Sequence, residues 1–132
     1  MTSDVAIVSP HDDIRLLLRG LLKLHRFHVI REGSGPTALA GLTDGERPVV
    51  ILDADLDEVG WAEAVRDLRS RRPDLPLLLL TSTRSPRVGP QAKASGIGAI
   101  VHRPFAVHDL IEAVTGLAGP PAPSPPAEAV AK

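Results

Sequence analysis

The 132-residue chain contains no cysteine and no tyrosine, and its aromatic side chains other than histidine are Phe27, Trp61 and Phe105. Without cysteine, the chain can form neither a disulfide nor a thiolate metal site, and thiol catalysis is excluded. Because hydrophobic residues still make up 43% of the chain, its core must be built mainly from leucine, valine, isoleucine and alanine.

The chain also lacks a strong charge of either sign and any long apolar run. A formal net charge of −1 gives no general attraction to nucleic acid or to anionic membranes. No apolar stretch approaches the ~20 residues that cross a bilayer, and the first residues, Met1 to Asp4, do not have the pattern of a signal peptide. We therefore expect one cytoplasmic domain that neither enters a membrane nor binds nucleic acid directly.

Five short apolar runs have the length and composition of buried parallel strands. They are Val5–Val8, Phe27–Ile30, Val49–Leu52, Leu77–Leu80 and Ala99–Val101.

The segments between and after these runs favour helices, because their apolar residues recur at helical spacing. We expect these helices over Ile14–Leu22, from Gly33 to near Leu42, from Trp61 to Leu68, within residues 85–94, and from Leu110 to Leu117. Two prolines and a glycine fall within residues 85–94, so the fourth helix should start late or be irregular.

Five strands alternating with five helices predict a parallel sheet covered on both faces, wound as a doubly wound α/β fold. In such folds the functional site lies beyond the carboxyl ends of the strands. The segments that follow the strands are Ser9–His11, Asp53–Asp55, Thr81–Thr83 and His102–Phe105. From residue 119 the composition changes to proline and alanine, which predicts a domain over residues 1–118 and a flexible tail over 119–132.

These strand-end segments resemble, in order and spacing, those of response-regulator receiver domains over roughly residues 4–118. The resemblance implies a CheY-like, flavodoxin-like fold with strand order 2-1-3-4-5. Asp53 matches the family's phosphate-accepting aspartate, and Thr81 matches its hydroxyl residue. The stretch from Ala94 to Phe105 is similar to the family's Ala-Gly to Lys-Pro-Phe segment, at the same spacing.

The chain departs from the family at the residues that hold magnesium. In the family an acidic pair after the first strand, the acceptor aspartate and a backbone carbonyl hold Mg²⁺. Here Ser9 and Pro10 stand at the acidic pair, so only Asp53 and the carbonyl of Asp55 remain as weak metal candidates. Using Asp12 and Asp13 as the pair would disrupt the helical pattern that starts at Ile14. We expect no resident cofactor, and weak magnesium binding at most.

Two further departures affect residues that, in the family, respond to phosphorylation. Arg103 replaces the family's lysine, and its guanidinium has two open interpretations: a bidentate pair with Asp53 that keeps the site neutral, or a side chain that points to solvent. Ile100 stands where many receivers have an aromatic ring that moves inward, a motion isoleucine cannot reproduce. The acids of the loop 54–60 fit either a solvated loop or a substitute cation site.

The sequence therefore favours an atypical receiver that is not an enzyme and acts, without phosphorylation, as a signalling protein–protein interaction module. As the resemblance implies, a partner protein or a second copy would bind through roughly residues 87–117. One alternative is a working phosphoacceptor, phosphorylated at Asp53 in a two-component phosphorelay. Another is a ligand-sensing receiver with a small molecule under Ser9, Pro10 and Arg103. The chain is either a stand-alone regulator or the receiver part of a longer protein.

Overall fold

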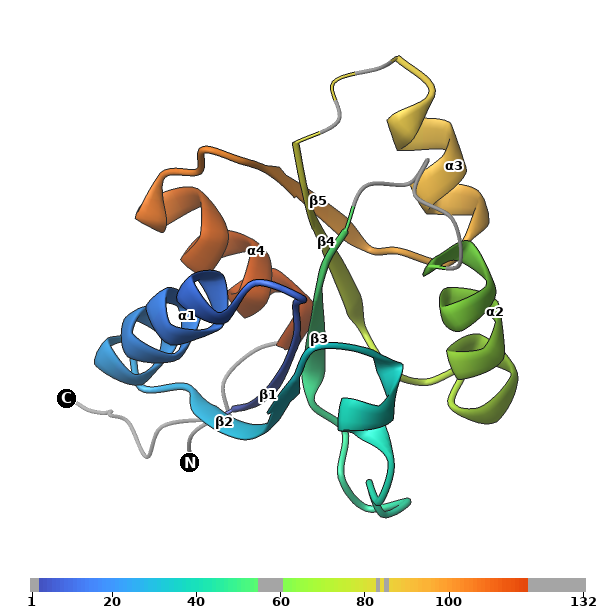
Figure 1. The fold of residues 1–132 in the computed structure, drawn as a ribbon, viewed down its shortest axis with the longest axis horizontal. Helices are drawn as coiled ribbons and strands as arrows, with labels where there is room; N and C mark the ends of the chain where they lie inside the picture. The colour runs from blue at the N-terminus through green and yellow to red at the C-terminus, as the bar shows by residue number, and fades with distance from the viewer. Residues whose placement is uncertain (1–2, 55–60, 83, 85, 119–132) are drawn as a thin grey trace, which may run out of the picture.

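The computed structural model describes residues 3–54, 61–82, 84 and 86–118 (Figure 1). Five strands form one parallel sheet in the order β2-β1-β3-β4-β5. They are β1 (Asp4–Val8), β2 (His28–Gly33), β3 (Val49–Asp53), β4 (Leu77–Thr81) and β5 (Ala99–His102). The predicted doubly wound fold and its strand order are confirmed.

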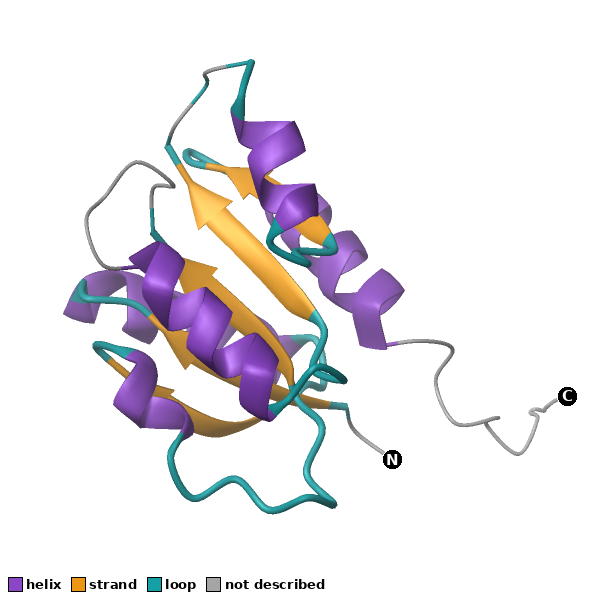
Figure 2. Ribbon diagram, turned by 90° about the vertical axis from the view of Figure 1, so that its right-hand side faces the viewer, coloured by secondary structure: helices purple, strands orange, loops and turns teal. Residues whose placement is uncertain are grey.

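Helices cover both faces of the sheet (Figures 1 and 2). On one face lie α1 (Asp12–Leu24) and α4 (Val107–Ala118). On the other lie the 3₁₀ helix η1 (Pro36–Leu39), α2 (Trp61–Arg71) and α3 (Val88–Ala94). None of the helices within the described residues is both long enough and apolar enough to span a bilayer.

The core divides into two layers because side chains alternate across each strand. On β3, Val50 and Leu52 pack with the layer under η1, α2 and α3, whereas Val49 and Ile51 pack with the layer under α1 and α4. Both faces of the strand are therefore buried, which is why β3 and β4 are almost continuously apolar.

The predicted number of helices was wrong by one. The structure has four α-helices and a 3₁₀ helix within the described residues, in place of five helices. The segment Gly33–Leu42, predicted as a helix, is strand up to Gly33 and helical only over Pro36–Leu39. Ala40, which follows η1, is extended with a ψ of 138° and ends the helix, and Gly41 after it has a φ of +88°, outside the helical region.

The fourth predicted helix starts late, as its prolines indicated. Helix α3 begins at Val88, after Pro86, and it holds Pro90 in its first turn. Proline is tolerated there because the amide groups of a first turn have no partner within the helix.

Candidate functional site

The carboxyl ends of four strands bring Ser9, Asp53, Thr81 and Arg103 together, and we call these four residues the strand-end site. Asp53 ends β3 and Thr81 ends β4, while Ser9 follows β1 and Arg103 follows β5. Ser9, Asp53 and Thr81 are the buried polar residues of the described core. Polar side chains at this depth need partners, because burial removes the hydrogen bonds that water would supply.

Ser9 supplies one of these partners to Asp53. Its Oγ donates a hydrogen bond to Oδ2 of Asp53 at 2.6 Å, and both groups are buried. Two further hydrogen bonds hold Ser9 in place: the His11 amide donates to Ser9 Oγ at 3.1 Å, and the Arg15 side chain donates through Nη1 to the Ser9 carbonyl at 2.5 Å. The serine at the position of the acidic pair is thus a fixed donor to the carboxylate.

Arg103 supplies the charge partner. Its Nη1 lies 3.1 Å from Oδ1 of Asp53, where the Asp53 side chain is fully buried and that of Arg103 is 22% exposed. The contact is an ion pair without a well-aligned hydrogen bond to Oδ1 among the described residues. The Arg103 side chain thus faces Asp53 rather than solvent, but the contact is not the bidentate hydrogen-bonded pair of the first interpretation. The two carboxylate oxygens face different partners, a hydroxyl and a guanidinium.

The backbone also fixes the position of Arg103. Its amide donates to the Thr81 carbonyl at 2.8 Å, which extends the pairing of β4 and β5 by one residue. The peptide bond between Arg103 and Pro104 is cis. Ile100 lies on β5, half-buried against the core layer under α2 and α3.

The remaining candidates lie apart from this cluster or outside the described residues. Pro10 is exposed. Asp12 and Asp13 stand in the first turn of α1, where Asp12 pairs with Arg15 and Asp13 Oδ1 accepts the Ile14 amide. Asp55, and with it the acidic loop up to residue 60, lies outside the described residues, as does the predicted tail 119–132.

The residues of the strand-end site do not fit a magnesium ion. Mg²⁺ prefers several carboxylate or water oxygens in octahedral geometry, whereas Asp53 is the single carboxylate here and its oxygens face Ser9 Oγ and Arg103. Within the described part of the chain, no group of three or more His, Cys, Asp or Glu side chains could hold a metal ion.

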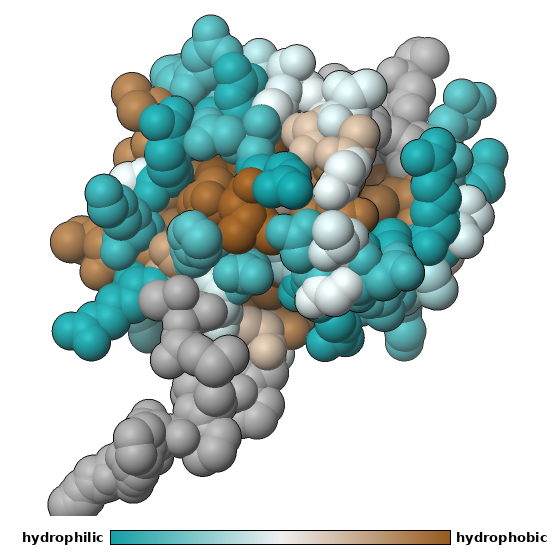
Figure 3. Space-filling view, turned by 90° about the horizontal axis from the view of Figure 1, so that it is seen from below, coloured by the Kyte–Doolittle hydropathy of each residue, from teal (hydrophilic) through white to brown (hydrophobic). Residues whose placement is uncertain are grey.

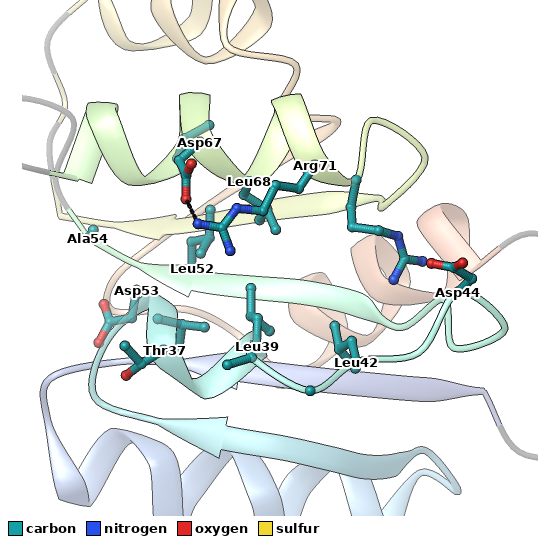
Figure 4. Close-up of a pocket in the computed structure, with 15 residues that line it drawn as sticks. Thr37, Leu39, Leu42, Asp44, Leu52, Asp53, Ala54, Asp67, Leu68 and Arg71 are labelled. Atoms are coloured by element: carbon teal, nitrogen blue, oxygen red, sulfur yellow. Dashed lines mark ion pairs between the residues drawn. The ribbon is translucent and has the colours of Figure 1, made fainter.

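A cavity of about 640 Å³ adjoins the strand-end site, and the sequence analysis missed it. It lies between β3, α2 and the segment from Thr37 to Asp44, and Asp53 and Ala54 line one end (Figure 4). None of Ser9, Pro10 and Arg103 is among its lining residues. The signal in the sequence that could have revealed it is the pair of glycines at positions 41 and 45, which favour a short second helix and therefore a space beside β3.

The strand order, the aspartate that ends β3 and the hydroxyl residue that ends β4 are those that the resemblance to receiver domains implied. Comparison with known proteins gives the family: residues 5–115 match the response regulator receiver domain. The chain belongs to this family, whose members are signalling modules.

The fold is also that of solved receivers. The chemotaxis protein CheY4 of Vibrio cholerae superposes with a TM-score of 0.75 at 23% identity, covering 89% of this chain and 99% of that chain. A response regulator from Thermotoga maritima gives a TM-score of 0.76 at 18% identity, covering 89% and 98%. At these identities the likeness shows the fold alone.

Curated relatives are longer proteins. Response regulator MprA of Mycobacterium leprae is 28% identical over 127 residues, which is 95% of this chain and 56% of that protein. Regulatory protein AtoC of Escherichia coli is 26% identical over 106 residues, or 80% of this chain and 23% of that protein. The chain thus spans between about a quarter and a little over half of these two relatives.

Proposed function

We propose that this receiver is a phosphorylation-independent, cytoplasmic protein–protein interaction module whose acceptor site is neutralised from within. One observation carries the proposal: Arg103 Nη1 lies 3.1 Å from Oδ1 of the buried Asp53. A carboxylate that attacks a phosphodonor needs a free oxygen and a metal that neutralises the phosphoryl charge. Here the hydroxyl of Ser9 occupies one oxygen, and the guanidinium of Arg103 neutralises the other.

The ion pair between Arg103 and Asp53 also stabilises the present conformation, and so opposes a conformational change on phosphorylation. Breaking a buried ion pair by removing one partner costs on the order of 3–5 kcal/mol, because a charge is left uncompensated. A phosphoryl group on Asp53 would have to displace Arg103 or Ser9, which stabilise the present conformation. Ile100 adds to this, since a branched side chain packed in the core layer cannot swing as a large ring does.

The interaction surface in this proposal is the side formed by α3, β5 and α4, residues 87–117. The strand β5 stands at the edge of the sheet, next to β4, so its outer side is available to a partner. The exposed face of α4 presents charged groups, including the His108–Glu112 pair at 3.4 Å, beside the exposed Val107. Such a mixed polar and apolar surface suits another protein or a second copy of this chain, and it lacks the basic excess that nucleic acid requires.

A second candidate function, phosphorylation at Asp53 in a phosphorelay, is favoured by family membership and by the retained Asp53 and Thr81. The two functions differ in how the site responds to beryllofluoride, a phosphoryl analogue. We expect fluorine NMR of the wild-type chain with Mg²⁺ and beryllofluoride to show no bound resonances.

The matched positive control restores the family's residues. In the triple variant Ser9→Asp, Pro10→Asp, Arg103→Lys, two carboxylates and a lysine surround Asp53, and bound fluorine resonances should appear. Bound resonances in the wild-type chain, lost in Asp53→Asn, would favour phosphorylation instead.

A further inference from the structure

The cavity beside β3, which we call the α2 cavity, has the size and lining of a small-molecule site. Leu39 and Leu42 approach it from one side, and Leu52 and Leu68 from the other (Figure 4). Val8, Val65, Ala40 and Ala54 also belong to its apolar lining. Its volume of about 640 Å³ lies within the range of roughly 300–1,000 Å³ that is typical of sites for small organic ligands.

The local sequence keeps this space open. The connection from β2 to β3 contains only η1 and then a loop with Gly41 at φ +88°. Arg72, the residue after α2, fixes the far side of the loop: its Nη1 donates to the Thr43 carbonyl at 3.1 Å and its Nη2 to the Glu46 carbonyl at 2.7 Å. The loop therefore cannot collapse onto Leu52 without breaking these hydrogen bonds.

Charge pairing around the cavity defines the class of ligand. Arg71 pairs with Asp67 at 2.9 Å, and Arg72 pairs with Asp74 at 3.1 Å. The lining carboxylate of Asp44 also interacts electrostatically with the Arg72 guanidinium. Asp53 faces Arg103 and Ser9, away from the leucines that line the cavity. A charged ligand would compete with these pairs or remain uncompensated, whereas an uncharged ligand would bury the apolar lining and leave every pair intact.

We propose that the α2 cavity binds an uncharged, largely apolar small molecule. Because Asp53 and Ala54 line one end of the cavity, the bound molecule contacts the carboxyl end of β3. The receiver would then sense a ligand at the face of the sheet opposite α1 and α4. This inference does not depend on whether Asp53 is phosphorylated.

Nile red, an uncharged dye that fluoresces in apolar surroundings, tests the proposal on the full 132-residue chain. We expect saturable binding with one site per chain. Leu42→Trp fills the cavity with an indole and should weaken binding more than about tenfold, the equivalent of 1.4 kcal/mol.

Leu24→Trp is the matched control, since the same substitution falls on α1, where Leu24 is 76% exposed and far from the cavity. This variant should bind the dye as the wild type does. Absence of saturable binding to the wild type, or undiminished binding to a folded Leu42→Trp variant, would overturn the proposal.

Methyl NMR of the wild-type chain decides the question without any variant. Dye binding should shift the methyl resonances of Leu39, Leu52 and Leu68 and leave those of Leu110 and Val114, in the opposite core layer, unchanged. Figure 3 shows apolar side chains exposed at the α1 side of the molecule, where Leu16, Leu17 and Leu24 provide a competing surface. Shifts confined to these three leucines would mean surface adsorption and would contradict the proposal.

Discussion

Arg103 reaches across the end of β4 to Asp53: its Nη1 lies 3.1 Å from Oδ1 of the aspartate, although Arg103 follows β5 and Asp53 ends β3, and these strands are not neighbours. Adjacent strands are about 4.8 Å apart, so the contact spans roughly two strand spacings and needs a long side chain. The arginine thus connects the end of β5 to the end of β3 within the strand-end site.

The first prediction concerns the stability of this pair. Arg103→Met should lower the free energy of unfolding by about 2–3 kcal/mol at neutral pH, somewhat less than for a fully buried pair because Arg103 is partly exposed. Adding Asp53→Asn should recover much of the loss, since the uncompensated charge disappears. Urea unfolding of the wild type, both single variants and the double variant gives the coupling energy. A coupling energy near zero would show that the pair contributes nothing.

The second prediction concerns the hydroxyl donor. Ser9→Ala leaves Oδ2 of the buried Asp53 without its donor, and should destabilise the fold by about 1–3 kcal/mol. Ser34→Ala, in an exposed turn after β2, is the matched control and should change stability by less than about 0.5 kcal/mol. Equal effects of the two substitutions in thermal or urea unfolding would argue against a structural role for the Ser9 hydrogen bond.

A third prediction concerns Arg69, which joins three segments of the backbone. Its Nη1 donates to the carbonyls of Pro73 and Leu75 at 3.0 and 2.5 Å, and its Nη2 donates to the Gly96 carbonyl at 2.5 Å. Arg69→Met removes all three hydrogen bonds and should cost on the order of 2–3 kcal/mol of stability.

Arg66 provides the control for this variant, because it lies on the same helix and is exposed. Arg66→Met should be nearly neutral. If urea unfolding gives the same midpoint for both variants, the role assigned to Arg69 is wrong.

The fourth prediction concerns pH. A hydrogen bond from Arg72 lowers the pKa of Asp74, and the hydrogen bond from the Thr43 amide lowers the pKa of Glu46. A carboxyl group whose pKa is lower in the folded state binds fewer protons there than in the unfolded chain. Each carboxyl group therefore contributes to the free energy of unfolding above its ordinary pKa, which is 3.8 for Asp74 and 4.5 for Glu46. This contribution is lost as the pH falls through the lowered pKa of the folded state.

Chemical unfolding between about pH 3 and pH 7 measures this loss. Asp74 is exposed and Glu46 is half-buried at the surface, so the effect should be small and should weaken further in high salt. The variant Asp74→Asn should show a shallower decrease below about pH 4 than the wild type. An identical pH profile would contradict the assignment to Asp74.

The sequence predicted the parts of the fold that depend on the order and spacing of apolar residues. The apolar runs of β3 and β4 identified two central strands, and Asp53 and Thr81 lie at their ends as that pattern placed them. Strand β2 was predicted only to Ile30, because its later residues are polar, yet as an edge strand it continues to Gly33. Hydrophobic pattern alone does not mark the end of a half-exposed strand.

Two features depended on tertiary contacts that no local pattern specifies. The direction of the Arg103 side chain was left open, since a long flexible guanidinium takes its position from its partner, here Asp53. The α2 cavity was missed because the leucines before and after Gly41 suited a helix, whereas the backbone at Gly41 and the hydrogen bonds of Arg72 impose a loop.

The most direct test of the central claim is intact-mass spectrometry of the full chain after incubation with acetyl phosphate and Mg²⁺, beside the variant Ser9→Asp, Pro10→Asp, Arg103→Lys as a positive control. If Arg103 and Ser9 hold Asp53 as the structure shows, the wild-type chain gains no phosphoryl group while the triple variant gains one. A wild-type chain that gains one phosphoryl group, with the gain abolished by Asp53→Asn, would contradict the account.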